Sequence, residues 1–127
     1  MRQDLQDWQK LNVAAFLASS VAVKFPEIHG RPFINASNVE YLPFIKQPIP
    51  IYKADNEAQI KRVFTRAKER TFSIGIYTKL LFTTNNEERN LEAIAQCTDE
   101  EQDLVGIILY GKNKKVDKAI KDLQFHP

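Results

Sequence analysis

The stretch DLQDWQKLNVAAFLASSVAVKF, residues 4–25, predicts one long helix that is largely buried. Asp7 can cap the start of this helix, and Pro26 ends it after Phe25. Apolar residues occupy more than one side of the predicted helix, which is typical of a helix that packs as a layer against a sheet. The fold should therefore contain a sheet on which this helix lies.

The rest of the chain contains several strand patterns that can supply this sheet. Two short β-type runs on either side of residues 35–38 predict a hairpin over residues 33–42. The segment PIPIYKA (48–54) alternates on one face, but its prolines confine its start to a sheet edge. FSIGIYT (72–78) is a clear strand, and DLVGIILYG (103–111) is hydrophobic enough to be a central strand covered on both faces.

Three further helices are predicted between and after these strands. Asp55 or Asn56 caps the first, Asn85 or Asn86 caps the second, and a short helix lies near the C-terminus. Helices that alternate with strands indicate a three-layer α/β/α domain, for which we expect a mixed sheet. Because no repeat or linker interrupts the pattern, we predict one domain over residues 1–127.

Two features of the strand segments predict how the sheet packs. Ile107 and Leu109 should be among the most buried side chains if their strand is central. Gly75 and Gly106 interrupt strands, and each should allow a helix to approach closely or a bulge to form.

The residues before the long helix are few. A helix of this kind normally follows a first strand, but only Met1 to Leu5 precede it. Either the sheet lacks a full first strand, or the true start of the protein lies upstream of Met1. We favour the second interpretation and expect a truncated first strand.

Composition excludes several classes of protein. A formal net charge of +2 on 127 residues does not indicate a dedicated nucleic-acid-binding protein. Cys97 is the single cysteine, so an intramolecular disulfide or a multi-cysteine metal site cannot form. No apolar run is long enough for a membrane span, and no secretion signal is visible. We expect a cytoplasmic protein with no membrane contact, no cofactor and no metal site.

Four segments resemble a known family over nearly the whole chain. They are DLQDWQKLNVAAFL, YLPFIKQPIPIYKAD, IYTKLLFTTNNEERN and DLVGIILYGKNKKVDKAIKDL. They are similar to an uncharacterised bacterial family, the domain of unknown function two thousand. That family is related in fold to the type-two peptidyl-tRNA hydrolases, so the resemblance implies a hydrolase-like fold.

The start of the long helix resembles one signature of these hydrolases, a Lys-x-Lys-x-Ala-Ala-Gln pattern. Lys10 matches the first lysine, and Ala14 and Ala15 match the two alanines. Asn12 stands in place of the second lysine, and Phe16 stands in place of the glutamine. The resemblance implies that this chain keeps part of the hydrolase site and has lost two of its polar groups.

The second signature is a lysine that closes the strand before the next helix, followed by acidic residues. Lys53, Asp55 and Glu57 match this arrangement. The hydroxyl residues that the family carries beyond the next strand have possible counterparts in Thr78, Thr83 and Thr84.

These residues also have simpler interpretations. Lys53 can be a solvated lysine at a strand end, Asp55 can be a helix cap, and Asn12 can satisfy a neighbouring backbone group. If they form a site, we predict that Lys10, Asn12 and Lys53 border one cleft with Phe16 as its apolar wall. Asn12 can exchange hydrogen bonds there but cannot supply charge.

Basic residues cluster on two predicted helices, where they can follow a phosphate backbone such as that of tRNA. Solvated helix faces explain the same pattern, and we favour that interpretation. The two groups are Arg62, Arg66 and Arg70, and Lys112, Lys114, Lys115, Lys118 and Lys121.

Three functions from different classes follow. The first, which we favour, is a module that binds an anionic or acylated ligand in the hydrolase-like cleft. The second is an active hydrolase of peptidyl-tRNA or a related acyl ester. Such an enzyme needs a base or an orienting group for the attacking water and hydrogen-bond donors for the oxyanion that forms on the ester. The third is a structural homodimer without a small-molecule site, in which the interface covers sheet edges.

Overall fold

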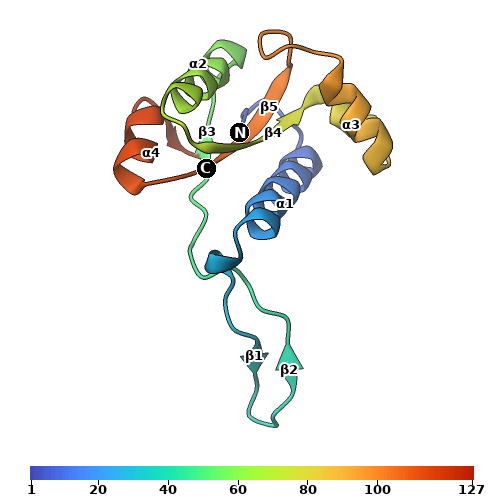
Figure 1. The fold of residues 1–127 in the computed structure, drawn as a ribbon, viewed down its shortest axis with the longest axis vertical. Coiled ribbons are helices and arrows are strands. Elements are labelled where there is room, and N and C mark those ends of the chain that lie inside the picture. Colours follow the sequence, from blue (N-terminus) through green and yellow to red (C-terminus); the bar gives the residue numbers. More distant parts are fainter.

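Two antiparallel strands, β4 and β5, form the centre of the domain, with helices on both faces (Figure 1). The computed structural model describes all of residues 1–127 and shows a mixed α/β architecture. The helices are α1 (Asp7–Lys24), α2 (Glu57–Glu69), α3 (Glu87–Ala95) and α4 (Asn113–Ala119), with short 3-10 turns η1 (Pro26–Ile28) and η2 (Lys79–Phe82). The strands are β1 (Phe33–Ile34), β2 (Glu40–Tyr41), β3 (Tyr52–Lys53), β4 (Ser73–Thr78), β5 (Leu104–Tyr110) and β6 (Gln124–Phe125).

The residues before α1 join the strand pairs into one layer. The backbone N–H of Arg2 donates to Val105 at 2.9 Å, and the N–H of Ala54 donates to Met1 at 2.8 Å. Arg2 runs parallel to Ala54, whereas β3–β6 and β4–β5 are antiparallel. The strands therefore form three separate antiparallel pairs rather than the mixed sheet that we predicted, and the one parallel contact is the isolated bridge between Arg2 and Ala54.

Side chains from the two faces of this layer form two small cores. Under α1, Val13 and Leu17 pack with Tyr77 and Val105. Under α2, the second core contains Ala54, Ile60, Phe64 and Leu104. Leu104 and Val105 point to opposite faces, as successive strand residues do, so β5 is anchored from both sides.

The close approach of α1 to the sheet depends on two glycines, as the sequence predicted. A Cβ atom on Gly106 would lie 2.5 Å from Val13 Cγ1, and one on Gly75 would lie 2.7 Å from Ser20 Oγ. Carbon atoms in contact are normally about 3.5–4.0 Å apart, so neither position has room for a side chain. The two glycines let the helix lie directly on the strand backbones.

The prediction that Ile107 and Leu109 are among the most buried residues is wrong. Both are only partly buried, whereas Leu104 and Val105 at the other end of β5 are 0% and 1% exposed. The reason is an open apolar cleft beside the second half of β5, which Ile107 and Leu109 line.

The helix starts differ from the sequence prediction at one of three positions. Asp7 is the first residue of α1 rather than its cap, because Gln6 takes the cap position and its N–H donates to Gln9 Oε1 at 3.0 Å. Between the alternatives left open, Asn56 caps α2 and Asn86 caps α3. Each cap oxygen accepts a bond from the N–H three residues on, which satisfies a donor of the first turn.

The prolines of residues 48–54 shorten the strand predicted there. The strand is reduced to Tyr52 and Lys53, which pair with Phe125 and Gln124 of β6, and to the bridge that Ala54 makes with Arg2. A proline has no N–H to donate, so the earlier part of the segment runs as an unpaired strap along the cleft.

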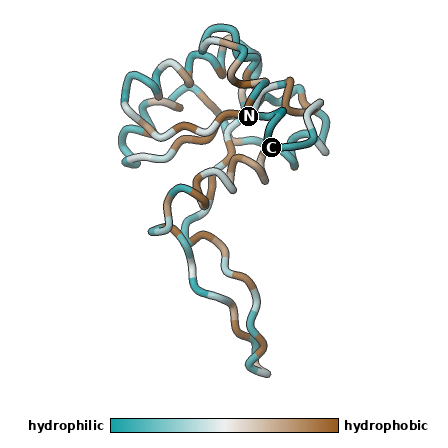
Figure 2. The backbone as a smooth tube through the Cα atoms, turned by 45° about the vertical axis from the view of Figure 1, so that its right-hand side comes forward, coloured by the Kyte–Doolittle hydropathy of each residue, from teal (hydrophilic) through white to brown (hydrophobic).

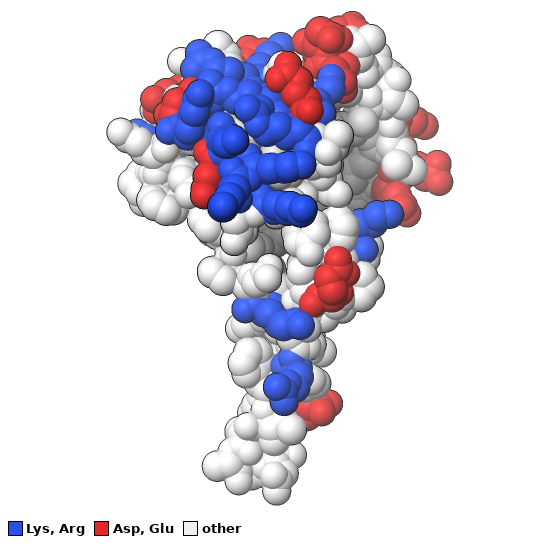
Figure 3. Space-filling view, turned by 60° about the vertical axis from the view of Figure 1, so that its left-hand side comes forward, with Lys and Arg blue, Asp and Glu red and all other residues white.

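Figure 3 shows Lys and Arg side chains gathered over the face formed by α2 and α4. Two of the arginines on this face have a structural role. Arg62 and Arg66 bind the two carboxylate oxygens of Asp122 at 2.8 Å and 2.7 Å, which ties the end of α4 to α2. Arg70 donates to the carbonyl of Arg66 at 3.1 Å. The arginine stripe therefore serves mainly to attach α4.

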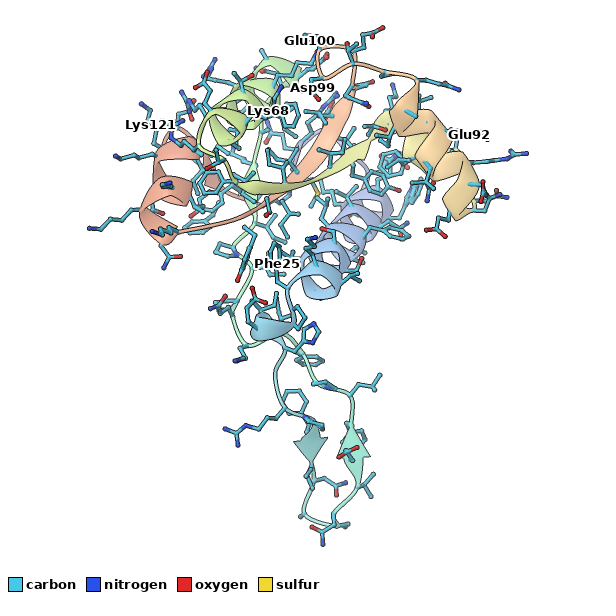
Figure 4. All side chains as sticks on the ribbon, in the orientation of Figure 1. Phe25, Lys68, Glu92, Asp99, Glu100 and Lys121 are labelled. Carbon is cyan, nitrogen blue, oxygen red and sulfur yellow. The ribbon has the colours of Figure 1, made fainter.

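A second cross-link holds the far end of α2. Lys68 and Asp99 point toward one another between α2 and the turn that precedes β5, and they form an ion pair (Figure 4).

None of the helices is long and apolar enough to cross a membrane.

Replacing Gly106 with alanine should destabilise the domain, because the new methyl group would overlap Val13. Overpacking of a core typically costs about 1–3 kcal/mol, which urea unfolding would resolve. Gly106→Ala combined with Val13→Ala should recover much of this loss, because the second change makes room for the methyl group. If the stability lost in the double variant equals the sum of the losses in Gly106→Ala and Val13→Ala, then contact with Val13 does not cause the loss in Gly106→Ala.

Asp122→Asn should weaken the domain at neutral pH and reduce its sensitivity to acid. Hydrogen bonds from Arg66 and Arg62 hold the pKa of Asp122 below its usual value of 3.8. A lowered pKa means that the carboxylate stabilises the fold above pH 3.8, and that this contribution is lost as the pH falls through the folded-state pKa.

Thermal unfolding measured between neutral and acidic pH tests this expectation. Glu88→Gln on α3 is the matched control, because Glu88 is exposed and makes no ion pair. If the melting temperatures of Asp122→Asn and the parent depend on pH in the same way, the expected role of Asp122 is contradicted.

Candidate functional site

The structure places Asn12 and Phe16 together in a cleft between α1, β4 and the start of α3, which we call the α1–α3 cleft. Its volume is about 560 Å³. Trp8, Asn12 and Phe16 are spaced four residues apart, so they lie on one face of α1 and all three line the cleft. Lys10 lies on a different face of α1, the face that also carries Ala14, and it is not among the residues that line the α1–α3 cleft.

Four aromatic rings form one continuous wall of the α1–α3 cleft. Trp8 meets Phe82 edge-on with ring centres 5.8 Å apart, Phe82 lies 5.0 Å from Tyr77, and Tyr77 lies 6.0 Å from Phe16. Trp8 and Phe16 remain 51% and 58% exposed, although both rings have a packing partner. A ligand in the cleft would therefore meet the faces of large apolar rings.

Tyr77 presents a free hydroxyl within this aromatic wall. The residue as a whole is 7% exposed, it lines the cleft, and its hydroxyl makes no hydrogen bond within the chain. Burial raises the pKa of Tyr77, so the hydroxyl keeps its proton at neutral pH and can donate it. The hydroxyl is not among the buried unpartnered polar atoms of the chain, so it reaches solvent and is open to a ligand or water.

Amide side chains supply the polar groups of the cleft, Asn12 from α1 between Trp8 and Phe16, and the others from α3 and the residues before it. The Thr84 hydroxyl hydrogen-bonds to Asn90 Oδ1, which leaves the Asn90 amino group free to donate. Asn12 makes no side-chain hydrogen bond within the chain and lies at the cleft with Asn85. Asn86 also borders the cleft, but its oxygen is used as the α3 cap.

The cleft is almost without charge. Glu87, in the first turn of α3, is the one charged residue that lines it. Uncharged donors and acceptors beside aromatic rings suit a neutral ligand with amide or carbonyl groups. No three or more His, Cys, Asp or Glu side chains come together in a group that could hold a metal ion.

Lys53 and Asp55 lie at a different place, between β3 and α2. Lys53 Nζ is 3.5 Å from the Asp55 carboxylate, and the Asp55 N–H donates to Gln59 Oε1 at 2.6 Å. Neither residue lines the α1–α3 cleft, so the structure does not bring Lys53 and Asn12 into that cleft together.

The other predicted hydroxyl residues are also separate from the α1–α3 cleft. Thr78 pairs with Leu104, whose side chain belongs to the core under α2, and the Thr78 hydroxyl is buried without a partner. Thr83 donates to the carbonyl of Leu80 at 2.7 Å and closes η2. Of the threonines that the sequence singled out, Thr84 is the one at the cleft.

A second cleft, which we call the apolar cleft, opens on the side of the sheet near α4. It lies between α1, the second half of β5, α4 and the strap of residues 45–52, and its volume is about 770 Å³. Twenty of its 26 lining residues are hydrophobic, and Asp117 is the one with a charge. None of the residues predicted to form a site lines it, although Ala14 does.

A family model described as "Protein of unknown function (DUF2000)" matches residues 1–127. The chain belongs to this family. No curated protein matches the DUF2000 chain. Among solved structures, it is similar to the protein of unknown function Atu0240 from Agrobacterium tumefaciens strain C58. The two are 32% identical with a TM-score of 0.94, and the match covers 100% of this chain and 93% of that one.

These similarities confirm the predicted family and the α/β fold of the DUF2000 chain. Because the match to Atu0240 covers the whole chain, it includes the hairpin β1–β2. The relationship to the peptidyl-tRNA hydrolases stays a prediction.

Sequence reasoning missed the residues that make the aromatic wall, above all Trp8, Tyr77 and Phe82. One signal could have found Trp8, because it stands four residues before Asn12 and eight before Phe16 on the same helix face. Tyr77 and Phe82 carried no such signal, because strand and turn aromatics are most often core residues.

Replacing Tyr77 with phenylalanine should leave the stability of the domain unchanged within about 0.5 kcal/mol, because no internal hydrogen bond is lost. Urea unfolding would measure the difference. A loss of more than about 1 kcal/mol would show that the hydroxyl has a partner in the folded chain.

Proposed function

We propose that this domain binds a neutral, acylated ligand that carries an amide group, and that the α1–α3 cleft is the binding site. The observation that carries the proposal is that Tyr77, whose hydroxyl has no partner in the chain, lines a cleft together with Asn12 and Asn90, whose amino groups are free to donate. A site that leaves several donors and acceptors unused gains affinity when a ligand pairs them.

The chemistry of the cleft lining supports an acyl amide. Asn12 and Asn90 can each donate from an amino group, and the Asn12 oxygen can accept, so together they complement both ends of an amide. The rings of Phe16, Tyr77 and Phe82 would cover an apolar acyl or aromatic part of the ligand.

The lining favours a neutral ligand over the anionic one that the sequence also allowed. Lys10 and Lys53, the two lysines predicted for the site, do not line the cleft, and Glu87 would repel an anion near it. For the same reason we propose binding rather than hydrolysis, because the lysines that the hydrolase resemblance assigns to the site are elsewhere.

Binding of two matched probes tests the proposal. N-acetyl-L-phenylalaninamide is neutral, and N-acetyl-L-phenylalanine differs from it by carrying a carboxylate. Trp8 is the single tryptophan and lines the cleft, so its fluorescence reports binding, and calorimetry gives an independent affinity. We expect saturable binding of the neutral probe and weaker binding of the carboxylate.

Cleft variants should weaken the neutral probe. Asn12→Ala and Tyr77→Phe each remove one hydrogen bond of roughly 1 kcal/mol, which corresponds to about five- to tenfold in Kd. Lys10→Ala is the matched control on the same helix and should leave the affinity unchanged. Failure of the neutral probe to bind, or preference for the carboxylate, would overturn the proposal.

A further inference from the structure

Residues 31–44, which we call the arm, project from the domain as a long hairpin (Figure 1). The arm joins the body at a narrow base, where the Gly30 N–H donates to Phe44 and the Lys46 N–H donates to Ile28, both at 2.8 Å. Every residue of the arm is exposed. The arm therefore buries almost nothing against its own chain.

The surface of the arm is apolar for most of its length. Figure 2 shows hydrophobic stretches on both of its limbs, and Figure 3 shows that its tip has no charged side chain. Phe33 meets Phe44 edge-on with ring centres 4.9 Å apart, but this pair covers only part of either ring. The large exposed apolar residues of the arm are Phe33, Ile34, Val39, Tyr41, Leu42 and Phe44.

The arm nevertheless has a defined shape. The Asn35 carboxamide oxygen accepts from the N–H of Ser37 at 2.9 Å and of Val39 at 3.0 Å, and Asn38 adopts the left-handed conformation with φ 63°. These are turn features that asparagine favours, so the sequence specifies this hairpin. A hairpin with two-residue strands is not stable in isolation, which means that packing against something else must hold it.

The apolar cleft of the same chain offers a matching surface. The strap that leads away from the arm lines this cleft through Ile45 and Pro48, so the arm leaves the body at the edge of the cleft and points away from it. The arm cannot fill its own cleft from this position. The arm contains only Arg31 and Glu40 as charged residues, and the cleft contains only Asp117.

We propose that two copies of this chain form a dimer in which the arm of each copy covers the apolar cleft of the other. Closed two-fold dimers are the commonest assemblies of identical chains, and they place two surfaces of one chain against each other reciprocally. The apolar cleft is then complete only in the dimer. This assembly is independent of the ligand proposed for the α1–α3 cleft.

The area available is sufficient for a stable interface. A buried aromatic side chain covers roughly 150–250 Å². Because Phe33, Tyr41 and Phe44 are 50%, 55% and 73% exposed, they can together supply roughly a third to a half of the ~800 Å² that each partner contributes to a standard interface. Ile34, Val39 and Leu42 add further apolar area.

Sedimentation velocity and light scattering of the full chain test the assembly. The parent should have the mass of two chains. A variant with Phe33→Ser, Leu42→Ser and Phe44→Ser should have the mass of one chain with an unchanged circular dichroism spectrum, because these residues do not pack in the body. Leu91→Ser is the matched control, since Leu91 is an exposed apolar residue on α3 that should not affect the dimer.

A mixed cross-link tests where the arm lies. In a Cys97→Ser background, one preparation carries Leu42→Cys on the arm and the other carries Asn113→Cys at the rim of the apolar cleft. A disulfide-linked dimer should form in the mixture far more than in either preparation alone. A monomeric parent, a dimer that survives the triple serine change, or a mixture that forms no additional cross-link would each overturn the proposal.

Discussion

The close contact between α1 and the backbones of β4 and β5 is the constraint on which the rest of the domain depends. Gly75 pairs with Ile108 and Tyr77 pairs with Gly106, so each of these cross-strand pairs combines a glycine with a large residue. The glycines admit the helix and the large residues flank it. Because the helix has no freedom to slide on such a surface, its orientation determines which of its faces point into each cleft.

This orientation divides α1 between two different environments. One face carries Trp8, Asn12 and Phe16 toward the polar and aromatic α1–α3 cleft. Another carries Ala14 and Ala18 toward the apolar cleft beside β5. The α1 residues at the apolar cleft also include Leu17 and Val21 and are all apolar, whereas the face at the α1–α3 cleft presents two large rings and an amide.

Charge in this domain is used mainly to attach elements to one another. Arg62 and Arg66 share Asp122 of the segment after α4, and Lys68 pairs with Asp99 of the loop before β5. These pairs lie near the surface, so each contributes little stability alone, but together they position the helices on the α2 face. The α1–α3 cleft, by contrast, relies on neutral hydrogen-bonding groups, which is why its predicted chemistry differs from that of a phosphate site.

The family, the order of the helices and of strands β1–β5, the hairpin and the roles of Gly75 and Gly106 could be predicted from the sequence, whereas β6 was not predicted. Each of these depends on local patterns, such as the spacing of apolar residues, asparagine turns and proline breaks, which act over a few neighbouring residues. Asn12 and Phe16 were also within reach, because helical spacing places them on one face.

Which residues share a cleft depends on the tertiary packing and could not be predicted. Lys10 and Asn12 are two positions apart, but two helix positions differ by more than half a turn, so they face different surroundings. Tyr77 and Thr78 are adjacent, but strand geometry sends their side chains to opposite faces. Partial exposure of Ile107 and Leu109 has the same origin: a hydrophobic strand is buried only where another element covers it, and that covering comes from residues distant in the sequence.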